Sequence, residues 1–410
     1  MKARLGRGRR GLPARRRAVA VTIAVALGAS TSSALDANRV HTFVLGRGTA
    51  VAAAEGLNAS NDNRAPLRLP GHVALTLRAR IPGGIGQAPV SDEAGALFIV
   101  HGEPRLSKLD AKARIQWSER LPSEASCSPV LLSGGSLLVL TRNAQALLVL
   151  ADGRPQRTVT LDLADPRKRT VAIPTANGGA LLASGRDLIQ LDANAEILRQ
   201  SRLGGSVSSV AEAGSDAIAI LENGTVEVAH AAGDFERVGS FSGTVPDGAA
   251  VDGRQVVALV DSHKLQRLDR VSGALLTLVE EPSVGLSGPL ALLGAGGSAW
   301  VIEGGFVSVR NRSGAEILRV PVGMPGQTSD PALRGVPPAR LIADDAGAIA
   351  AVRGGTDAVV VSANGAIERL DGTACLEPFR PTPTRSGLVL SCRSGQLFVV
   401  GGSAPTTNTP

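Results

Sequence analysis

The chain of 410 residues is poor in aromatic side chains, with no tyrosine, two tryptophans, seven phenylalanines and an aromatic content of 2%. Sites for carbohydrate and for single-stranded nucleic acid usually present aromatic rings on which sugars or bases stack. The scarcity of rings therefore disfavours both kinds of ligand. Long uninterrupted helices are disfavoured as well, because 49 glycines and 24 prolines interrupt the sequence every few residues. This composition predicts many short strands joined by turns.

Cysteine is also scarce, with three residues and no two of them adjacent. In an exported protein an odd number leaves one thiol over. Cys375 and Cys392 bracket the first two strands of the last repeat described below, and an oxidising compartment would permit a disulfide between them. Such a bridge would stabilise the fold by about 3 kcal/mol, provided that the strand register brings the two Cα atoms close enough. For Cys127 we expect a buried thiol.

The positive charge is concentrated at the N-terminus. The formal net charge is +7, but eight positive charges precede the first acidic residue, Asp36, so the rest of the chain is close to neutral. Nucleic-acid binding requires a clustered basic face, and a near-neutral body gives no reason to expect one. We therefore predict no nucleic-acid partner.

The N-terminal segment has the three regions of a secretory signal peptide: a basic stretch to residue 17, an apolar run over residues 18–29, and small residues that end at Ala34. We predict a signal peptide over residues 1–34, cleaved after Ala34, and a secreted or periplasmic protein. The apolar run has 12 residues, whereas a membrane-spanning helix needs roughly 20. The alternative is an uncleaved leader, which would be the chain's one attachment to a membrane. Arginine pairs in the basic stretch leave both the general secretory and the twin-arginine export routes open.

Two further segments are expected to lack a fold. Residues 35–71 are polar or featureless and contain Pro66 and Pro70, so we predict a flexible linker there. Residues 403–410 are expected to form a disordered tail. The folded domain is then predicted to span residues 72–402.

Relatives of one hairpin recur along this domain. Residues 187–205 read as a strand, a tight Asp-Ala-Asn-Ala turn and a second strand, and each unit combines such a hairpin with two preceding strands. Pro89, Pro129 and Pro174 open successive units and are 40 and 45 residues apart. A period of about 40–45 residues with four strands per unit is typical of a β-propeller. The sequence contains eight such units, which predicts an all-β, eight-bladed propeller of four-stranded antiparallel blades.

The last unit stops short of its fourth strand, after Val400. At the other end of the domain, Val73 to Ile81 alternates apolar and more polar residues, as a half-buried strand does. We predict that this N-terminal strand completes the eighth blade, which closes the ring and covers an exposed edge.

The pattern Leu-Asp-x-x-x-x-Ile-x-Trp over residues 109–117, echoed at Leu191-Asp192 and Leu268-Asp269, resembles the pyrroloquinoline-quinone type of propeller repeat. That family contains quinoprotein dehydrogenases and non-catalytic scaffolds. In the enzymes, tryptophans recur at the hairpin ends, adjacent cysteines pair near the quinone, and a Glu-Asn-Asp set holds calcium. Here only Trp117 occupies such a position, and the corresponding residues are not aromatic: Gln200, Thr277 and Val320. The resemblance therefore implies the non-enzymatic branch, without a cofactor or a metal.

Other candidate chemistry is sparse. The five histidines have no metal-ligand spacing, and His101 and His263 both end second strands, which would bring them to one rim of the ring. We interpret them as surface residues of loops. Asp261 and the pair Asp344-Asp345 follow apolar strands, where carboxylates commonly cap turns. No catalytic, cofactor-binding or metal-binding residue is predicted.

The sequence therefore favours an exported monomeric scaffold that binds a protein partner in the cell envelope. The alternative is a divergent quinoprotein-like enzyme or a small-ligand binder that uses the central funnel. The longest loop between units, residues 323–338, is the first candidate for a contact surface, unless it is only a spacer.

Overall fold

The computed structural model describes the following parts of the chain: residues 50–52, 54, 58, 64–65, 69, 73–165, 168, 170–230, 233–246, 248–280, 286–293, 296–302, 306–321, 340–344, 347–352, 358–362, 366–369, 379–385 and 387–402. They all belong to one compact unit, residues 42–410. The predicted signal peptide, the predicted tail, Cys375, Asp345 and the loop over residues 323–338 lie outside the described residues.

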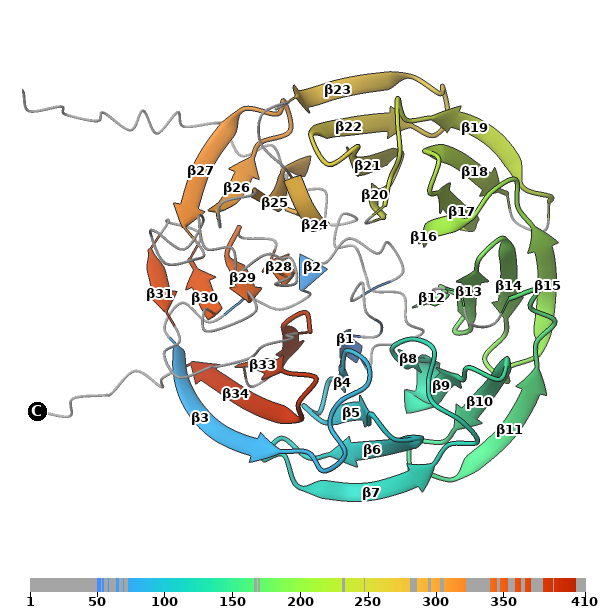
Figure 1. The fold of residues 1–410 in the computed structure, drawn as a ribbon, viewed down its shortest axis with the longest axis vertical. Coiled ribbons are helices and arrows are strands. Elements are labelled where there is room, and N and C mark those ends of the chain that lie inside the picture. Colours follow the sequence, from blue (N-terminus) through green and yellow to red (C-terminus); the bar gives the residue numbers. More distant parts are fainter. Residues whose placement is uncertain are drawn as a thin grey trace, which may run out of the picture. The chain divides into compact units, whose positions relative to one another are not determined.

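Eight antiparallel blades form a ring (Figure 1), which confirms the predicted fold. The strands of blades 1 to 4, from the ring axis outward, are β4 (Val90–Asp92), β5 (Leu97–Val100), β6 (Arg105–Leu109), β7 (Ile115–Arg120); β8 (Val130–Leu131), β9 (Leu137–Leu140), β10 (Gln145–Val149), β11 (Pro155–Thr160); β12 (Thr170–Pro174), β13 (Ala180–Ser184), β14 (Asp187–Leu191), β15 (Ile197–Arg202); β16 (Val207–Ala213), β17 (Asp216–Leu221), β18 (Thr225–Ala229), β19 (Glu236–Ser240). A 3-10 turn, η2 (Ser133–Gly135), joins β8 to β9.

The remaining blades follow the same order. Their strands are β20 (Ala249–Asp252), β21 (Gln255–Val260), β22 (Lys264–Asp269), β23 (Leu275–Glu280); β24 (Leu286–Leu292), β25 (Ser298–Ile302), β26 (Phe306–Arg310), β27 (Glu316–Pro321); β28 (Arg340–Asp344), β29 (Ile349–Val352), β30 (Ala358–Val361), β31 (Ile367–Arg369); β32 (Thr382–Thr384), β33 (Gly387–Ser391), β34 (Gln396–Gly402). Within the described residues no helix is long and apolar enough to cross a membrane.

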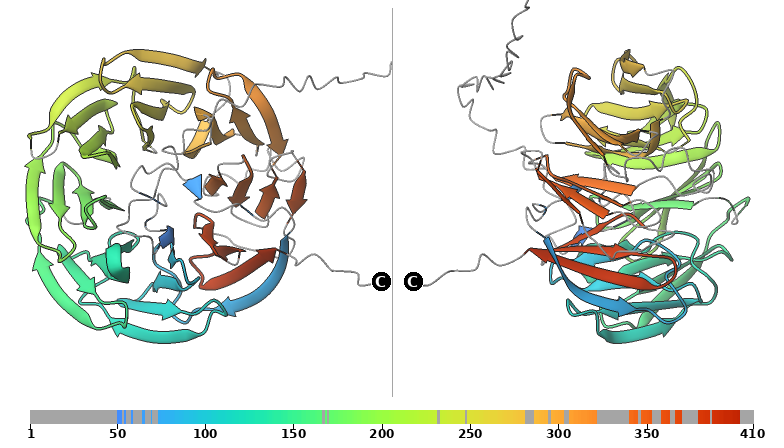
Figure 2. Two further views of the ribbon diagram at one scale, coloured as in Figure 1. Left: turned by 180° about the vertical axis from the view of Figure 1, so that it is seen from behind. Right: turned by 60° about the vertical axis from the view of Figure 1, so that its left-hand side comes forward.

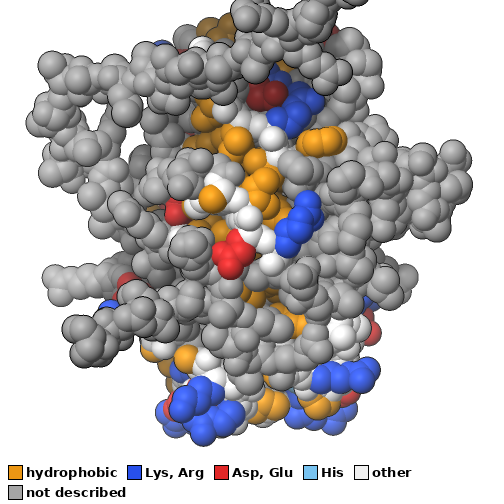
Figure 3. Space-filling model, turned by 90° about the vertical axis from the view of Figure 1, so that its left-hand side faces the viewer, with side chains coloured by type: hydrophobic (Ala, Val, Ile, Leu, Met, Phe, Trp, Pro, Cys, Tyr) orange, Lys and Arg blue, Asp and Glu red, His pale blue; other side chains and the backbone are white. Residues whose placement is uncertain are grey.

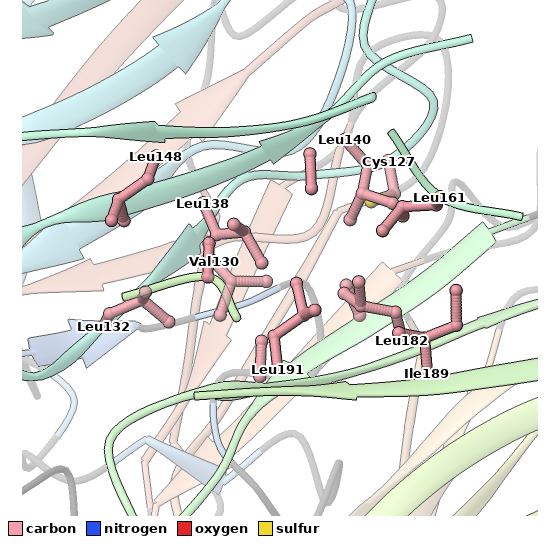
Figure 4. Close-up of a cluster of buried hydrophobic side chains, with 14 residues drawn as sticks. Cys127, Val130, Leu132, Leu138, Leu140, Leu148, Leu161, Leu182, Ile189 and Leu191 are labelled. Carbon is pink, nitrogen blue, oxygen red and sulfur yellow. The ribbon is translucent and has the colours of Figure 1, made fainter. Parts of the chain in front are cut away.

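The hydrophobic core is divided among the seams between blades. Eight buried clusters occur among the described residues, and each joins two neighbouring blades. In the seam between blades 2 and 3, Val130 and Leu138 face Leu182 and Leu191, with Cys127 at the edge (Figure 4). A four-stranded sheet has two apolar faces, and the ring buries both of them because every blade has two neighbours.

The ring is closed as the sequence predicts. Strand β3 (Val73–Arg80) pairs antiparallel with β34 and forms the outer strand of blade 8, with Val73 opposite Gly402 and Arg80 opposite Gln396. Figure 2 shows the two strands side by side from both directions. The chain therefore enters the ring with the strand that its last blade lacks.

The segment expected to be a linker contains two short strands. Strand β1 (Ala50–Ala52) pairs antiparallel with β4 of blade 1, and β2 (Arg64–Ala65) pairs parallel with β28 of blade 7. Both lie on the axis side of the inner strands (Figure 1). The described part of residues 35–71 thus differs from the expected linker, because the inner edges of two blades supply backbone partners that short polar stretches do not reveal in sequence.

The Leu-Asp motif has a local structural cause. Its aspartate accepts backbone hydrogen bonds within the turn between the third and fourth strands: Asp110 Oδ1 from Lys112 and Arg114, and Asp192 Oδ1 from Asn194 and Glu196. A later residue of the turn adopts positive φ, which favours glycine. That position is glycine in blades 2, 5 and 6 and alanine in blades 1 and 3: Gly153, Gly273, Gly314, Ala113 and Ala195.

The structure corrects the alignment of the repeats at Trp117. Trp117 lies opposite Lys108, and the residue at the same register of blade 3 is Arg199, opposite Gln190, so Gln200 was the wrong counterpart. Trp117 donates from Nε1 to the Ala151 carbonyl at 3.1 Å, in the turn of blade 2. Arg199 likewise reaches the turn of the following blade, where its guanidinium lies 4.8 Å from the Phe235 ring centroid. Blade-to-blade docking at this register therefore does not need an aromatic residue.

Candidate functional site

The antiparallel topology gives the ring two faces. On one side of the ring lie the turns that join the first strand of each blade to the second, and the third to the fourth; we call this side the turn face. The opposite side carries the other connections, and we call it the loop face. Residues 93–96 and 110–114 of blade 1 lie on the turn face, whereas residues 101–104 and 121–129 lie on the loop face.

The N-terminal segment starts from the turn face. Because β1 is antiparallel to β4, and Ala50 lies opposite Asp92 at the turn-face end, the chain runs along the ring axis toward the loop face. Strand β2 is parallel to β28 and brings the chain back, with Ala65 opposite Asp344. The two short strands therefore run in opposite directions beside the inner edges of blades 1 and 7.

Asp344 fixes the end of this path. Its side chain is 1% exposed and accepts two backbone hydrogen bonds: Oδ2 from Leu69 at 2.8 Å and Oδ1 from Ala348 at 2.9 Å. The predicted role of Asp344 as a turn cap is confirmed, and the bond to Leu69 adds an anchor for the N-terminal segment. Leu69 and Ala52 are both buried in the cluster between blades 7 and 8.

Asp261 was also expected to cap its own turn, but its carboxylate instead binds Thr244, which lies 17 residues earlier in the connection between blades 4 and 5. Its Oδ1 accepts hydrogen bonds from the backbone N–H of Thr244 at 2.7 Å and from the hydroxyl of Thr244 at 3.0 Å. These hydrogen bonds are the main cause that lowers the pKa of Asp261, and burial opposes them. Thr244 lies in the connection from blade 4 to blade 5, and Asp261 lies between β21 and β22 of blade 5. The hydrogen bonds therefore tie this connection to blade 5 at the loop face.

The histidines do not form one site. His101 and His263 both lie on the loop face, but His101 is 6% exposed, so its interpretation as a surface residue was wrong. His263 hydrogen-bonds through Nδ1 to the Asp261 carbonyl at 2.7 Å. His230 lies on the turn face, and His41 and His72 are outside the described residues. No group of three or more His, Cys, Asp or Glu side chains with metal-binding geometry occurs in the part of the chain that the structure describes.

His101 belongs to a polar relay that sequence analysis missed. Its Nδ1 lies 3.0 Å from the Pro82 carbonyl and its Nε2 lies 2.9 Å from Ser107 Oγ. Ser107 Oγ in turn lies 2.8 Å from Ser118 Oγ. Burial is the main cause that lowers the pKa of His101, so the imidazole is neutral near neutral pH. The relay joins His101, at the end of the second strand, to Ser107 and Ser118, which lie opposite each other on neighbouring strands. No spacing in the sequence predicts such a combination.

Charged residues gather at the turn face of blades 4 and 5. Asp216 forms an ion pair with Arg270 of the next blade, and their side chains are 16% and 14% exposed. His230 Nδ1 lies 2.9 Å from Asp216 Oδ1. Burial alone would raise the pKa of Asp216, but the hydrogen bonds from His230 and Arg270 outweigh it and lower the pKa.

Glu212, in the neighbouring strand β16, has the opposite shift. Burial raises the pKa of Glu212 to about 7, against one lowering hydrogen bond from the backbone N–H of Ala176. That bond is 2.5 Å long and joins blades 3 and 4. Perturbed carboxyl groups of this kind occur at functional sites, but no group of three or more metal-ligating side chains is found among the described residues.

Cys392 is disulfide-bonded, and its predicted pairing with Cys375 stays a prediction. Cys392 is fully buried in the cluster between blades 7 and 8, and Cys375 lies outside the described residues. Cys127 is buried in the seam between blades 2 and 3, as expected.

Large apolar side chains are exposed on the outer wall. Phe306 begins the third strand β26, and the others lie in or near the turns that lead into fourth strands: Ile115, Ile197, Leu198, Val271, Leu275, Leu276, Ile317 and Ile367. The wall that carries β27, β31 and β3 shows apolar side chains at the surface between charged ones (Figure 3). In blade 5 three of the exposed residues belong to a single hairpin: Val271 is 69% exposed, Leu276 55% and Leu275 40%.

These features define the molecule as an eight-bladed β-propeller. Among solved structures, it is similar to BamB from Moraxella catarrhalis, with a TM-score of 0.61, 15% sequence identity, and coverage of 80% of this chain and 99% of that chain. A computationally designed protein, Ika8, gives a TM-score of 0.62 at 14% identity over 79% of this chain and 97% of that chain. A streptogramin B lyase gives 0.50 at 12% identity over 82% and 99%. At these identities the likeness concerns the fold.

Sequence comparison adds no family. No protein-family model matches the chain, and no curated protein matches it.

Proposed function

We propose that the protein is an exported, monomeric propeller scaffold that binds another protein in the cell envelope and carries out no catalysis. The leader supports export, and the resemblance of the repeat to the pyrroloquinoline-quinone type supports a scaffold, together with a fold like that of BamB. The short strands β1 and β2 extend the inner edges of blades 1 and 7 of this propeller.

The observation that carries the proposal is the outer hairpin of blade 5. Val271, Leu275 and Leu276 expose apolar side chains within one hairpin, Val271 in the turn and the two leucines as the first residues of β23. Single exposed apolar residues are ordinary, whereas a contiguous apolar surface favours a protein contact. The predicted binding surface is therefore this hairpin, on the outer wall.

The course of the N-terminal segment weakens the alternative function. A small ligand or a quinone in the central funnel would need the inner strands, and β1 and β2 already occupy the axis side of β4 and β28. Quinone-dependent dye reduction, or a higher melting temperature in calcium, would support the alternative. The scaffold proposal predicts neither.

A binding experiment tests the scaffold. The full chain serves as bait in envelope extracts, beside a double variant Val271→Asp/Leu276→Lys, and a recovered protein is purified and titrated back. The matched control is Ile115→Lys, which changes an exposed apolar residue of another blade (51% exposed). We expect binding by the full chain and the control and at least a tenfold loss in the double variant, since a few residues carry most of an interface's free energy, about 2 kcal/mol or more each.

The experiment tests the scaffold function and the position of the binding surface separately. Recovery of no specific protein would contradict the scaffold. Equal binding by all three chains would contradict the choice of the blade 5 hairpin.

A further inference from the structure

We propose that Ser118 is a site of covalent acylation, with its hydroxyl coupled through Ser107 to His101, and that an activated carboxylic ester is the class of reagent it takes. This inference goes beyond the proposed scaffold function. It concerns one stoichiometric modification of the outer wall of blade 1.

The geometry is a continuous chain of three side chains. Ser118 Oγ lies 2.8 Å from Ser107 Oγ, across the pair of strands β6 and β7, and Ser107 Oγ lies 2.9 Å from His101 Nε2. Ser107 is fully buried, whereas Ser118 is exposed. The relay therefore connects a buried base to a hydroxyl that a reagent in solution can reach.

The hydrogen bonds of the relay all point from Ser118 toward His101. The Pro82 carbonyl can only accept, so His101 Nδ1 carries the proton of that hydrogen bond, and Nε2 of the neutral imidazole must accept. Ser107 then donates its single proton to Nε2, and Ser118 must donate to Ser107. The alignment makes His101 the general base for Ser118, with Ser107 as the positioning residue between them.

A cation lies at the end of the relay. Arg105 donates from its guanidinium to Ser118 Oγ at 3.2 Å. Its positive charge stabilises negative charge as it develops on that oxygen. Neither the arginine nor the serine is needed to fill the core, because both are exposed.

The relay depends on ring closure. Pro82 lies two residues after the end of strand β3, and the intervening Ile81 donates its backbone N–H to the Gly395 carbonyl of blade 8 at 2.8 Å. The carbonyl that orients His101 is thus held by the seam between blades 8 and 1. A chain whose ring is open would lose the orientation of the base.

With p-nitrophenyl acetate as the reagent, Ser118 is acetylated and p-nitrophenolate leaves. Ser118 Oγ forms a bond to the acetyl carbonyl carbon while its proton passes to Ser107 and the proton of Ser107 passes to His101 Nε2. The carbon–oxygen bond to p-nitrophenolate breaks with its electron pair. The imidazolium then returns one proton to the solvent, which leaves acetyl-Ser118 and a neutral relay.

The test uses the purified full chain with p-nitrophenyl acetate, and peptide mass spectrometry locates and times the acetyl group. The variants are Ser118→Ala, Ser118→Thr and Ser107→Ala. Ser123 is the internal control, because it is a partly exposed serine in the connection that follows blade 1, and its hydroxyl donates to the Glu124 carbonyl and to Asn143 Oδ1 rather than to a histidine relay. Circular dichroism melting checks that each variant is folded.

We expect one acetyl group on Ser118, none on Ser123, loss of the label in Ser118→Ala and partial labelling in Ser118→Thr. In Ser107→Ala the rate should fall at least tenfold while the melting temperature stays within a few degrees, because general-base assistance contributes about 10²–10⁴ in rate. Equal labelling of Ser118 and Ser123, or an unchanged rate in Ser107→Ala, would overturn the proposal.

Discussion

The backbone N–H of Leu69 donates a hydrogen bond of 2.8 Å to Asp344 Oδ2, across a sequence separation of 275 residues. The same carboxylate caps the turn between β28 and β29 through Ala348. One buried side chain thus serves both the blade and the segment that runs along the ring axis. The inner strands of blades 1 and 7 are therefore not free edges in the folded protein.

Replacing Asp344 by asparagine should destabilise the protein. An amide has one acceptor oxygen, so either Leu69 or Ala348 loses its partner, and an unsatisfied buried N–H costs about 1–3 kcal/mol. Urea unfolding measures the loss. Asp92→Asn is the matched control, because Asp92 accepts a single backbone hydrogen bond, from Ala96 at the corresponding turn. An equal loss in both variants would contradict the anchoring role of Asp344.

Gly153→Ala should destabilise the seam between blades 1 and 2. Gly153 has φ of +92°, and a Cβ atom there would lie 2.7 Å from the Trp117 ring. Gly347→Ala is the control, since φ is +90° and nothing lies within 4 Å. The control should cost about 1–2 kcal/mol from backbone strain alone, and Gly153→Ala clearly more. Thermal unfolding compares them, and equal losses would show that Trp117 does not pack on this turn.

The pair Asp216 and Arg270 should show strong coupling in a double-mutant cycle. Both side chains are largely buried between blades 4 and 5. Removing one partner of a buried pair leaves an uncompensated charge and costs about 3–5 kcal/mol, whereas removing both can cost little. We therefore expect Arg270→Met and Asp216→Asn each to lower the free energy of unfolding by more than the double variant does. Additive losses in urea unfolding would contradict the coupling.

Glu212 should make stability fall as pH rises. Its pKa in the folded protein is about 7, above the ordinary 4.5, so the native state holds a proton that the unfolded state releases. The free energy of unfolding therefore decreases between about pH 4.5 and pH 7 and is not further affected by this group above that range. Glu212→Gln removes this contribution. Melting temperatures of both chains across this range should converge in acid and diverge toward neutral pH with the variant more stable, and parallel curves would contradict the shift.

The sequence was sufficient for the fold because the repeat carries its own physical signals. Successive units repeat three signals: apolar second and third strands, a Leu-Asp turn cap, and glycines with positive φ. The strand at residues 73–80 had no partner within its own unit and could therefore be matched to the incomplete last blade. The role of Asp344 was found by the same reasoning, because a turn cap acts locally, through Ala348 in its own turn.

Other features could not be predicted because they depend on tertiary contacts. Strands β1 and β2 have three and two residues, too few for any periodicity, and exist because an inner strand edge lies beside them. The burial of His101 follows from the arrival of Pro82 across the closing seam. Arg199, by contrast, could have been aligned with Trp117 from the sequence, because it stands eight residues after Leu191 as Trp117 stands eight residues after Leu109, whereas Gln200 is one residue too far.

Closure of the ring by β3 is the central claim, and melting of truncated chains tests it most directly. A chain that begins at residue 70 lacks the axis segment but keeps β3, and a chain that begins at residue 83 lacks both. We predict a sharp drop in melting temperature between these two chains, reversed when a peptide of residues 72–82 is added. Equal melting temperatures for the two chains, with no effect of the peptide, would contradict closure by this strand.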